Sequence, residues 1–178
     1  MKRIAIIGAG IGGLTLARAL NEQAEVTVFE KARGVGGRMS TRYAEPFFFD
    51  HGTQFFTARD PAFQALVSGW VAEGLVAPWT GKVITLDADR KPTDRLWFEP
   101  HYVAVPNMNN LCKAMAMGLT VVTSSEVAPL AERETDGWHI MDRNGALLGV
   151  FDWVISTAPP AQTIRLFGPY LSPDQPLH

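Results

Sequence analysis

The feature that most constrains this chain of 178 residues is a glycine-rich turn near its N-terminus. Residues 4–7, before the turn, form a short β-branched apolar run, which is typical of a strand covered on both faces. After the turn, apolar residues recur at helical spacing over residues 11–21, and residues 25–30 return to the pattern of a strand. Strand, glycine turn, helix and strand in this order predict one βαβ unit with a right-handed crossover.

The turn has the spacing G-x-G-x-x-G at Gly8, Gly10 and Gly13. The first glycine permits the tight turn, the second lets a pyrophosphate approach the backbone, and the third lets the helix pack close to the strand. The helix directs its free N–H groups and its positive dipole end at the phosphate. Glu30 ends the second strand, where a carboxylate accepts both ribose hydroxyls of an adenosine. The unit is therefore predicted to hold the ADP half of a dinucleotide. The structural alternative is a glycine turn beside a solvated glutamate.

The segment after Glu30 is basic and rich in glycine. Residues 31–46 read KARGVGGRMSTRYAEP, which is the pattern of an extended loop. Residues 30–38 resemble the second fingerprint of glutathione-reductase-like flavoproteins of the amine oxidase type, in which a glycine pair and an arginine lie beside the FAD pyrophosphate. An arginine suits that place because its fork bonds phosphate oxygens bidentately. A flexible basic loop is the alternative.

Three stretches extend this resemblance: residues 33–39 (RGVGGRM), 50–60 (DHGTQFFTARD) and 154–159 (VISTAP). Together they resemble the bacterial renalase-like family of FAD-dependent oxidoreductases, and the resemblance runs from residue 1 to about residue 167. It implies FAD as cofactor and hydride transfer to the flavin from a small substrate, a dihydronicotinamide isomer or an amine, with reoxidation by oxygen. Family members are nearly twice as long, so the resemblance also implies a missing C-terminal half or a completing partner.

The resemblance places residues around the FAD and assigns no catalytic residue. The pyrophosphate would lie against the glycine turn, the ribose at Glu30, and the flavin end near residues 52–54. Thr157 would lie where the chain returns to the cofactor. Val127 would bond adenine through its backbone, although an ordinary strand valine is equally consistent with the pattern. The implied cofactor-binding set is Gly8, Gly10, Ile11, Gly12, Gly13, Glu30, Lys31, Gly37, Arg38, Gly52, Thr53, Gln54, Val127 and Thr157.

The whole pattern predicts an α/β fold with two parts. Residues 1–57 and 106–178 are expected to form a Rossmann-like FAD-binding domain that lacks its C-terminal segment, and residues 58–105 the first part of an α+β substrate domain. Two hairpin signals, Asp136-Gly137 and Asn144-Gly145, predict a three-stranded antiparallel meander over residues 126–149.

Two further helices have recognisable starts. Asp60 followed by Pro61 predicts an N-cap and a first helical position. Asn107 is predicted to cap a helix over residues 108–117. Residues 119–123 and 152–157 have the pattern of strands, and the segment at 160–167 that of a helix.

Composition excludes several classes of partner. The net charge is −2 and the charged residues are scattered, which gives no reason to expect nucleic acid as a partner. No stretch approaches the roughly 18 apolar residues needed to cross a bilayer, so no membrane association is expected. Cys112 is the only cysteine, so no internal disulfide forms, and we expect a cytoplasmic location.

Other candidate chemistry is sparse. His51, in the flavin-side loop, could act as an acid or base in catalysis. A structural role, in which it hydrogen-bonds the loop, is the favoured interpretation. The four histidines do not form metal-ligand spacings with one another or with Cys112, so no metal site is expected. Trp79 and Trp97 are interpreted as packing residues, with the wall of a substrate cavity as the alternative. A non-catalytic dinucleotide-binding module and an NAD-dependent dehydrogenase stay open as alternative functions.

Overall fold

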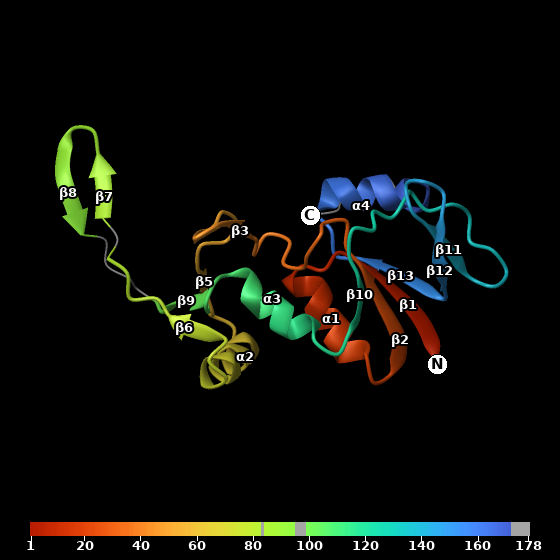
Figure 1. The fold of residues 1–178 in the computed structure, drawn as a ribbon, viewed down its shortest axis with the longest axis horizontal. Coiled ribbons are helices and arrows are strands. Elements are labelled where there is room, and N and C mark those ends of the chain that lie inside the picture. The colour runs from red at the N-terminus through yellow and green to blue at the C-terminus, as the bar shows by residue number, and fades with distance from the viewer. Residues whose placement is uncertain (83, 95–98, 172–178) are drawn as a thin grey trace. The chain divides into compact units, whose positions relative to one another are not determined.

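A computed structural model describes residues 1–82, 84–94 and 99–171 (Figure 1). The chain forms two compact units, one of Met1–Arg38 with Cys112–His178 and one of Met39–Leu111. The predicted division differs over residues 39–57 and 106–111, which it assigned to the FAD-binding part. The assignment of cofactor and substrate roles to the two parts stays a prediction.

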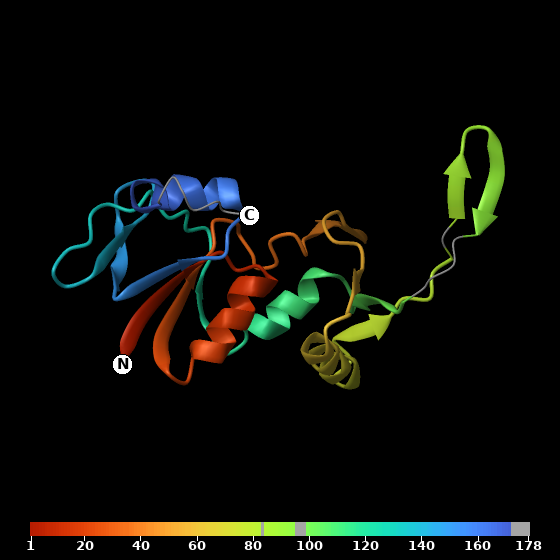
Figure 2. The same ribbon diagram turned by 180° about the vertical axis from the view of Figure 1, so that it is seen from behind.

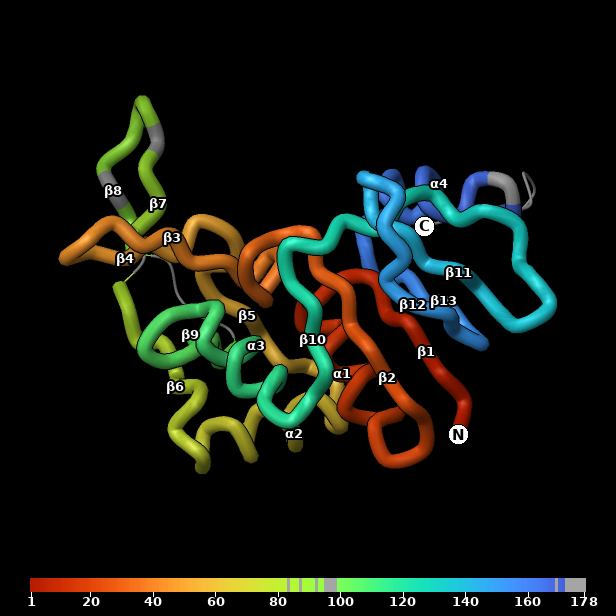
Figure 3. The backbone as a smooth tube through the Cα atoms, turned by 45° about the vertical axis from the view of Figure 1, so that its right-hand side comes forward, coloured from red at the N-terminus to blue at the C-terminus, as the bar shows by residue number. Residues whose placement is uncertain are grey.

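The first unit is built on a parallel sheet of four strands in the order β10-β2-β1-β13. The central strand β1 (Lys2–Ile7) pairs in parallel with β2 (Ala24–Phe29) and with β13 (Trp153–Ser156), and β10 (Thr120–Val122) pairs with β2. This order brings together segments far apart in the sequence, as the tube in Figure 3 shows. The parallel arrangement puts the C-terminal ends of β1, β2 and β13 at one edge, where the glycine turn begins.

Helix α1 (Ile11–Leu20) covers one face of this sheet, and α4 (Pro160–Phe167) lies on the other (Figures 1 and 2). A short 3-10 helix, η1 (Gly168–Tyr170), follows α4. The core on the α4 side includes Phe29, Ile140, Phe151 and Leu166. The rings of Phe29 and Phe151 meet edge to face at 5.7 Å, a favourable geometry for two aromatic rings. The predicted βαβ unit is thus confirmed, with its crossover helix packed on the sheet.

The predicted meander is present, but its first strand is reduced to a single β-bridge. Strands β11 (Trp138–Met141) and β12 (Leu147–Phe151) form an antiparallel hairpin, and Val127 bridges Asp142 beside it. The Asn144-Gly145 signal is correct: Asp142 Oδ1 accepts the N–H groups of Asn144 and Ala146, both at 2.8 Å. The Asp136-Gly137 signal marks a tight turn that joins Glu134 to Gly137 before β11, rather than a connection between two strands of the meander.

In its described residues, the second unit contains small antiparallel sheets and a helix. Strands β5 (Phe56–Thr57), β9 (His101–Ala104) and β6 (Val76–Pro78) form one sheet, β3 (Thr41–Ala44) and β4 (Phe47–Asp50) a hairpin, and β7 (Ile84–Asp87) and β8 (Arg90–Asp94) another. Helix α2 (Pro61–Ala72) begins as predicted, because Asp60 Oδ1 accepts the N–H groups of Ala62 and Phe63. The extended loop predicted over residues 31–46 was wrong at its end, where β3 pairs with β4.

Helix α3 (Asn109–Ala116) begins close to the predicted position but is capped differently. The N–H of Met108 donates to Asp50 Oδ1 at 3.0 Å, and that of Asn109 donates to Thr41 Oγ1 at 3.2 Å. The side-chain oxygen of Asn107 instead accepts the hydroxyl of Tyr43 at 3.3 Å. The capping role predicted for Asn107 therefore belongs to two side chains of the β3–β4 hairpin. Among the described residues, no helix is both long and apolar enough to cross a bilayer.

Candidate functional site

Two glycines of the turn, Gly8 and Gly13, are required by the fold itself. Gly8 has φ +108°, a region that side chains rarely adopt, and its N–H donates to the carbonyl of Phe29 at 2.8 Å. A Cβ on Gly13 would lie 2.0 Å from the carbonyl oxygen of Gly8. These contacts place the start of α1 directly on the turn, as the sequence predicted.

The other two glycines, Gly10 and Gly12, have no such internal reason. A Cβ built on either residue would meet no atom within 4 Å, and Gly10 has an ordinary φ of −77°. Gly10 is the N-cap of α1 and supplies no capping side chain, and the first turn of this fully described helix holds no acidic residue. The N–H groups there suit an external anion, because a helix N-terminus carries unsatisfied donors and positive partial charge. Phosphate binding beside these glycines stays a prediction.

Glu30 lies at the end of β2, beside this turn, and is 7% exposed. Its Oε2 accepts the N–H of Ala9 at 2.9 Å, and its Oε1 accepts the N–H of Ala32 at 2.8 Å. A carboxylate offers about four lone-pair positions, so two remain for hydroxyl donors. The structure thus brings the predicted ribose carboxylate to the predicted phosphate turn, and its binding of ribose stays a prediction.

The loop after β2 lies against the same turn. Gly36 donates its N–H to the carbonyl of Ala9 at 2.9 Å, and a Cβ on Gly37 would lie 3.3 Å from Cα of Gly10. Both glycines have positive φ, +128° and +54°. Arg38 follows directly and is exposed. The set of cofactor-binding residues implied by the resemblance did not include Gly36. Its place in the glycine pair of this segment could have indicated that it lies at the site.

Three other predicted residues of the first unit have definite contacts. Thr157 Oγ1 lies 3.1 Å from the carbonyl oxygen of Gly8 and 3.2 Å from that of Ile7. Lys31 donates to Gln162 Oε1 on α4 at 3.1 Å. Val127 is paired in an isolated antiparallel bridge, and the hydrogen bonds of this bridge are made by the residues on either side of Val127. The N–H and C=O of Val127 itself therefore point to the other side of the strand. The predicted backbone contact of Val127 with adenine requires this orientation.

Gly52, Thr53 and Gln54 belong to the second unit, after β4, and their approach to a flavin stays a prediction. His51 Nε2 lies 3.3 Å from Ser40 Oγ, the type of loop contact that its structural reading anticipates. Trp79 stacks on Phe55 with ring centroids 5.4 Å apart, which favours packing. Trp97 lies outside the described residues.

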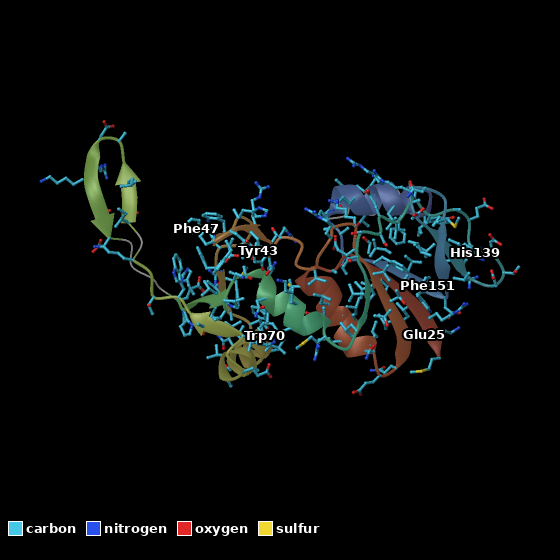
Figure 4. The ribbon with its side chains drawn as sticks, in the orientation of Figure 1. Glu25, Tyr43, Phe47, Trp70, His139 and Phe151 are labelled. Atoms are coloured by element: carbon cyan, nitrogen blue, oxygen red, sulfur yellow. The ribbon has the colours of Figure 1, made fainter. Side chains whose placement is uncertain are left out.

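The sequence reasoning missed a cluster of Glu134, Asp136 and His139, whose ligand atoms lie within 4.8 Å of one another. His139 Nε2 lies 2.9 Å from Asp136 Oδ1, and its Nδ1 lies 3.5 Å from Glu134 Oε1. The hydrogen bond from His139 lowers the pKa of Asp136 below its ordinary value. The two carboxylates lie beside opposite nitrogens of the half-buried imidazole ring (His139 in Figure 4).

Comparisons with known proteins agree with this geometry. Residues 6–70 match the NAD(P)-binding Rossmann-like domain. A stretch of 51 residues is 49% identical to 4,4'-diapophytoene desaturase (4,4'-diaponeurosporene-forming) from Staphylococcus aureus (strain Newman), covering 28% of this chain and 10% of the desaturase.

Two solved structures share the fold. An oxidoreductase from Methanosarcina mazei superposes with a TM-score of 0.69 at 16% identity, over 97% of this chain and 62% of that one. Wild-type putrescine oxidase bound to putrescine superposes with a TM-score of 0.72 at 15% identity, over 93% of this chain and 60% of that one. The α/β fold with a Rossmann-like dinucleotide-binding domain is therefore confirmed. The chain spans about three-fifths of the length of these two structures.

Proposed function

We propose that this chain binds FAD through its first unit and belongs to an FAD-dependent oxidoreductase. The observation that carries the proposal is the pair Gly10 and Gly12, which face open space at an uncapped helix N-terminus beside the buried Glu30. The backbone N–H groups of α1 would hold the pyrophosphate, and Glu30 would orient the ribose through its two remaining acceptor positions.

The loop after β2 contains the glycine pair and the arginine of the flavoprotein fingerprint that residues 30–38 resemble, and this resemblance supports FAD over NAD as the dinucleotide. The hydrogen bond from Gly36 to Ala9 and the close approach of Gly37 to Gly10 hold this loop against the glycine turn, and Arg38 follows directly in the chain. An arginine in that place adds a bidentate partner for phosphate oxygens. Bound FAD would supply the redox chemistry, taking a hydride from a small substrate, a dihydronicotinamide isomer or an amine, with oxygen as the final acceptor.

Further polypeptide, a C-terminal half or a partner chain, is proposed to complete the second unit. On the β3–β4 hairpin, Tyr43, Phe47, Phe48 and Phe49 are each more than half exposed (Tyr43 and Phe47 in Figure 4). Phe47 and Phe49 lie on one face of β4, and exposed apolar side chains that share a face mark contact surfaces. A cytoplasmic location stays part of the proposal, supported by the single buried cysteine.

Titration of the purified protein with FAD, ADP and NAD tests the cofactor assignment. We expect FAD to bind, ADP to compete with it, and NAD to bind at least about tenfold more weakly, equivalent to about 1.4 kcal/mol. Preference for NAD would favour a dehydrogenase and overturn the FAD assignment. Anaerobic mixing of the FAD-loaded protein with dihydronicotinamide isomers or amines then tests the chemistry. Bleaching of the flavin absorption supports an oxidoreductase, and FAD binding without bleaching by either class supports a non-catalytic module.

A further inference from the structure

The peptide group between Gly8 and Ala9 is held at both of its polar ends. The carbonyl oxygen of Gly8 lies 3.1 Å from the hydroxyl of Thr157, whose one proton it shares with the carbonyl of Ile7 at 3.2 Å. The N–H of Ala9 donates to Glu30 Oε2 at 2.9 Å. A trans peptide directs its C=O and N–H to opposite sides. Bonds to Thr157, after β13, and to Glu30, after β2, therefore fix the plane of this one peptide.

The Thr157 hydroxyl also lies in the space that Gly8 and Gly13 leave open because they have no side chain. A Cβ on Gly13 would lie 2.8 Å from Thr157 Oγ1, and a Cβ on Gly8 would lie 3.0 Å from it. The backbone N–H of Thr157 donates to the carbonyl of Ile7 at 3.0 Å, which extends the pairing of β13 with β1. The pairing of β13 with β1 thus positions the hydroxyl of Thr157, and this hydroxyl contacts the glycine turn.

We propose that Thr157 is a positioning residue of the nucleotide site. Through the Gly8–Ala9 peptide, its hydroxyl orients both the start of α1, which faces the phosphates, and the Glu30 carboxylate, which faces the ribose. This inference rests on the proposed dinucleotide binding and concerns only its ADP half. Without the hydroxyl the peptide is free to rotate, and the bond from Ala9 to Glu30 weakens at the same time.

The test compares three variants in titrations with ADP and with FAD. Thr157→Val keeps the shape of the side chain and removes the hydroxyl, so both dissociation constants should rise about five- to twelve-fold, the upper part of the range expected for one lost hydrogen bond. The factor should be equal for ADP and FAD, because the peptide contacts only the shared half. Thr157→Ser should restore both constants to within about twofold of wild type. Amide exchange at Ala9 should be faster in the valine variant.

Thr163→Val provides the matched control at the same corner of the fold. The hydroxyl of Thr163 bonds to the carbonyl of Ala158 at 3.1 Å and to Ser156 Oγ at 2.8 Å, rather than to the glycine turn. Its removal should leave ADP affinity within about twofold of wild type. If Thr157→Val does not fold, Thr157→Ala removes the same hydroxyl with less bulk and takes its place.

The outcomes separate the inference from the proposed function. Wild-type ADP affinity in Thr157→Val, no restoration by serine, or an equal loss in Thr163→Val would overturn the positioning role. A wild-type protein that binds ADP but not FAD would refute the FAD assignment, while the ADP series would still decide the role of Thr157. Binding of neither ligand by wild type would overturn both.

Discussion

The glycine turn has an inner side and an outer side, and they use glycine for different reasons. The inner pair, Gly8 and Gly13, faces the sheet and Thr157, where an added methyl group would meet protein atoms within 3.0 Å. The outer pair, Gly10 and Gly12, faces open space, where an added methyl group would meet none within 4 Å. Close contacts and the positive φ of Gly8 explain the inner pair, whereas no contact with protein atoms requires glycine at the outer pair. One motif therefore combines glycines that the fold requires with glycines that we propose leave room for a ligand.

The largest effect is expected on the inner side. In Gly13→Ala the new methyl group would lie 2.0 Å from the backbone oxygen of Gly8, so α1 must move away from β1. Because overpacking against backbone has no cheap relief, we expect the free energy of unfolding to fall by about 3 kcal/mol or more. Urea unfolding measures this change. Gly12→Ala, one residue earlier, is the control and should leave stability unchanged or raise it by up to about 1 kcal/mol. Equal stabilities of the two variants would abolish the distinction.

Glu30→Gln tests the residue that links the two sides. The carboxylate accepts two backbone N–H groups, from Ala9 and Ala32, and an amide presents only one acceptor oxygen. One buried donor loses its partner, so we expect a loss of about 1–3 kcal/mol in stability, together with weaker ADP binding. Glu25→Gln, at an exposed position on the same strand, should stay within about 0.5 kcal/mol of wild type. Glu30→Gln as stable as Glu25→Gln would show that these bonds contribute nothing.

Gly10→Ala tests the outer side alone. The added methyl group meets no protein atom and the backbone conformation is ordinary, so stability should stay within about 0.5 kcal/mol of wild type. The methyl group would stand between the backbone and a phosphate, so ADP affinity should fall at least about tenfold in a direct titration. Undiminished affinity would show that this open space is not where the phosphate binds.

The smallest effect concerns the opposite ends of the same strands, away from the turn. The Arg3 backbone N–H donates to Asp152 at 2.7 Å, and this bond lowers the pKa of Asp152. A carboxylate with a depressed folded-state pKa contributes stability that is present above its unfolded value of about 4 and is lost as pH falls further. We therefore expect the melting temperature to drop below about pH 4 in wild type and to drop less in Asp152→Asn. Equal acid sensitivity of the two proteins would contradict this assignment.

The elements around the turn were predictable because their signals are local. The apolar run of β1, the helical spacing of α1 and the position of Glu30 lie within 30 consecutive residues and form one supersecondary unit. The N-cap Asp60 and the turn at Asn144-Gly145 were predictable for the same reason, since each bond is made to a residue at most four positions away. In contrast, β3 became a strand only through its pairing with β4, for example Tyr43 with Phe48.

The sequence by itself determined that a glycine turn, a helix start and the carboxylate of Glu30 follow one another in a βαβ order. Only the tertiary structure decided which glycines the fold requires and which face open space. That distinction depends on Thr157, which lies 149 residues from Gly8 and reaches it because β13 pairs beside β1. A contact of such separation leaves no periodic or spacing signal in the sequence, because it is the sheet, and not the local chain, that brings the two residues together.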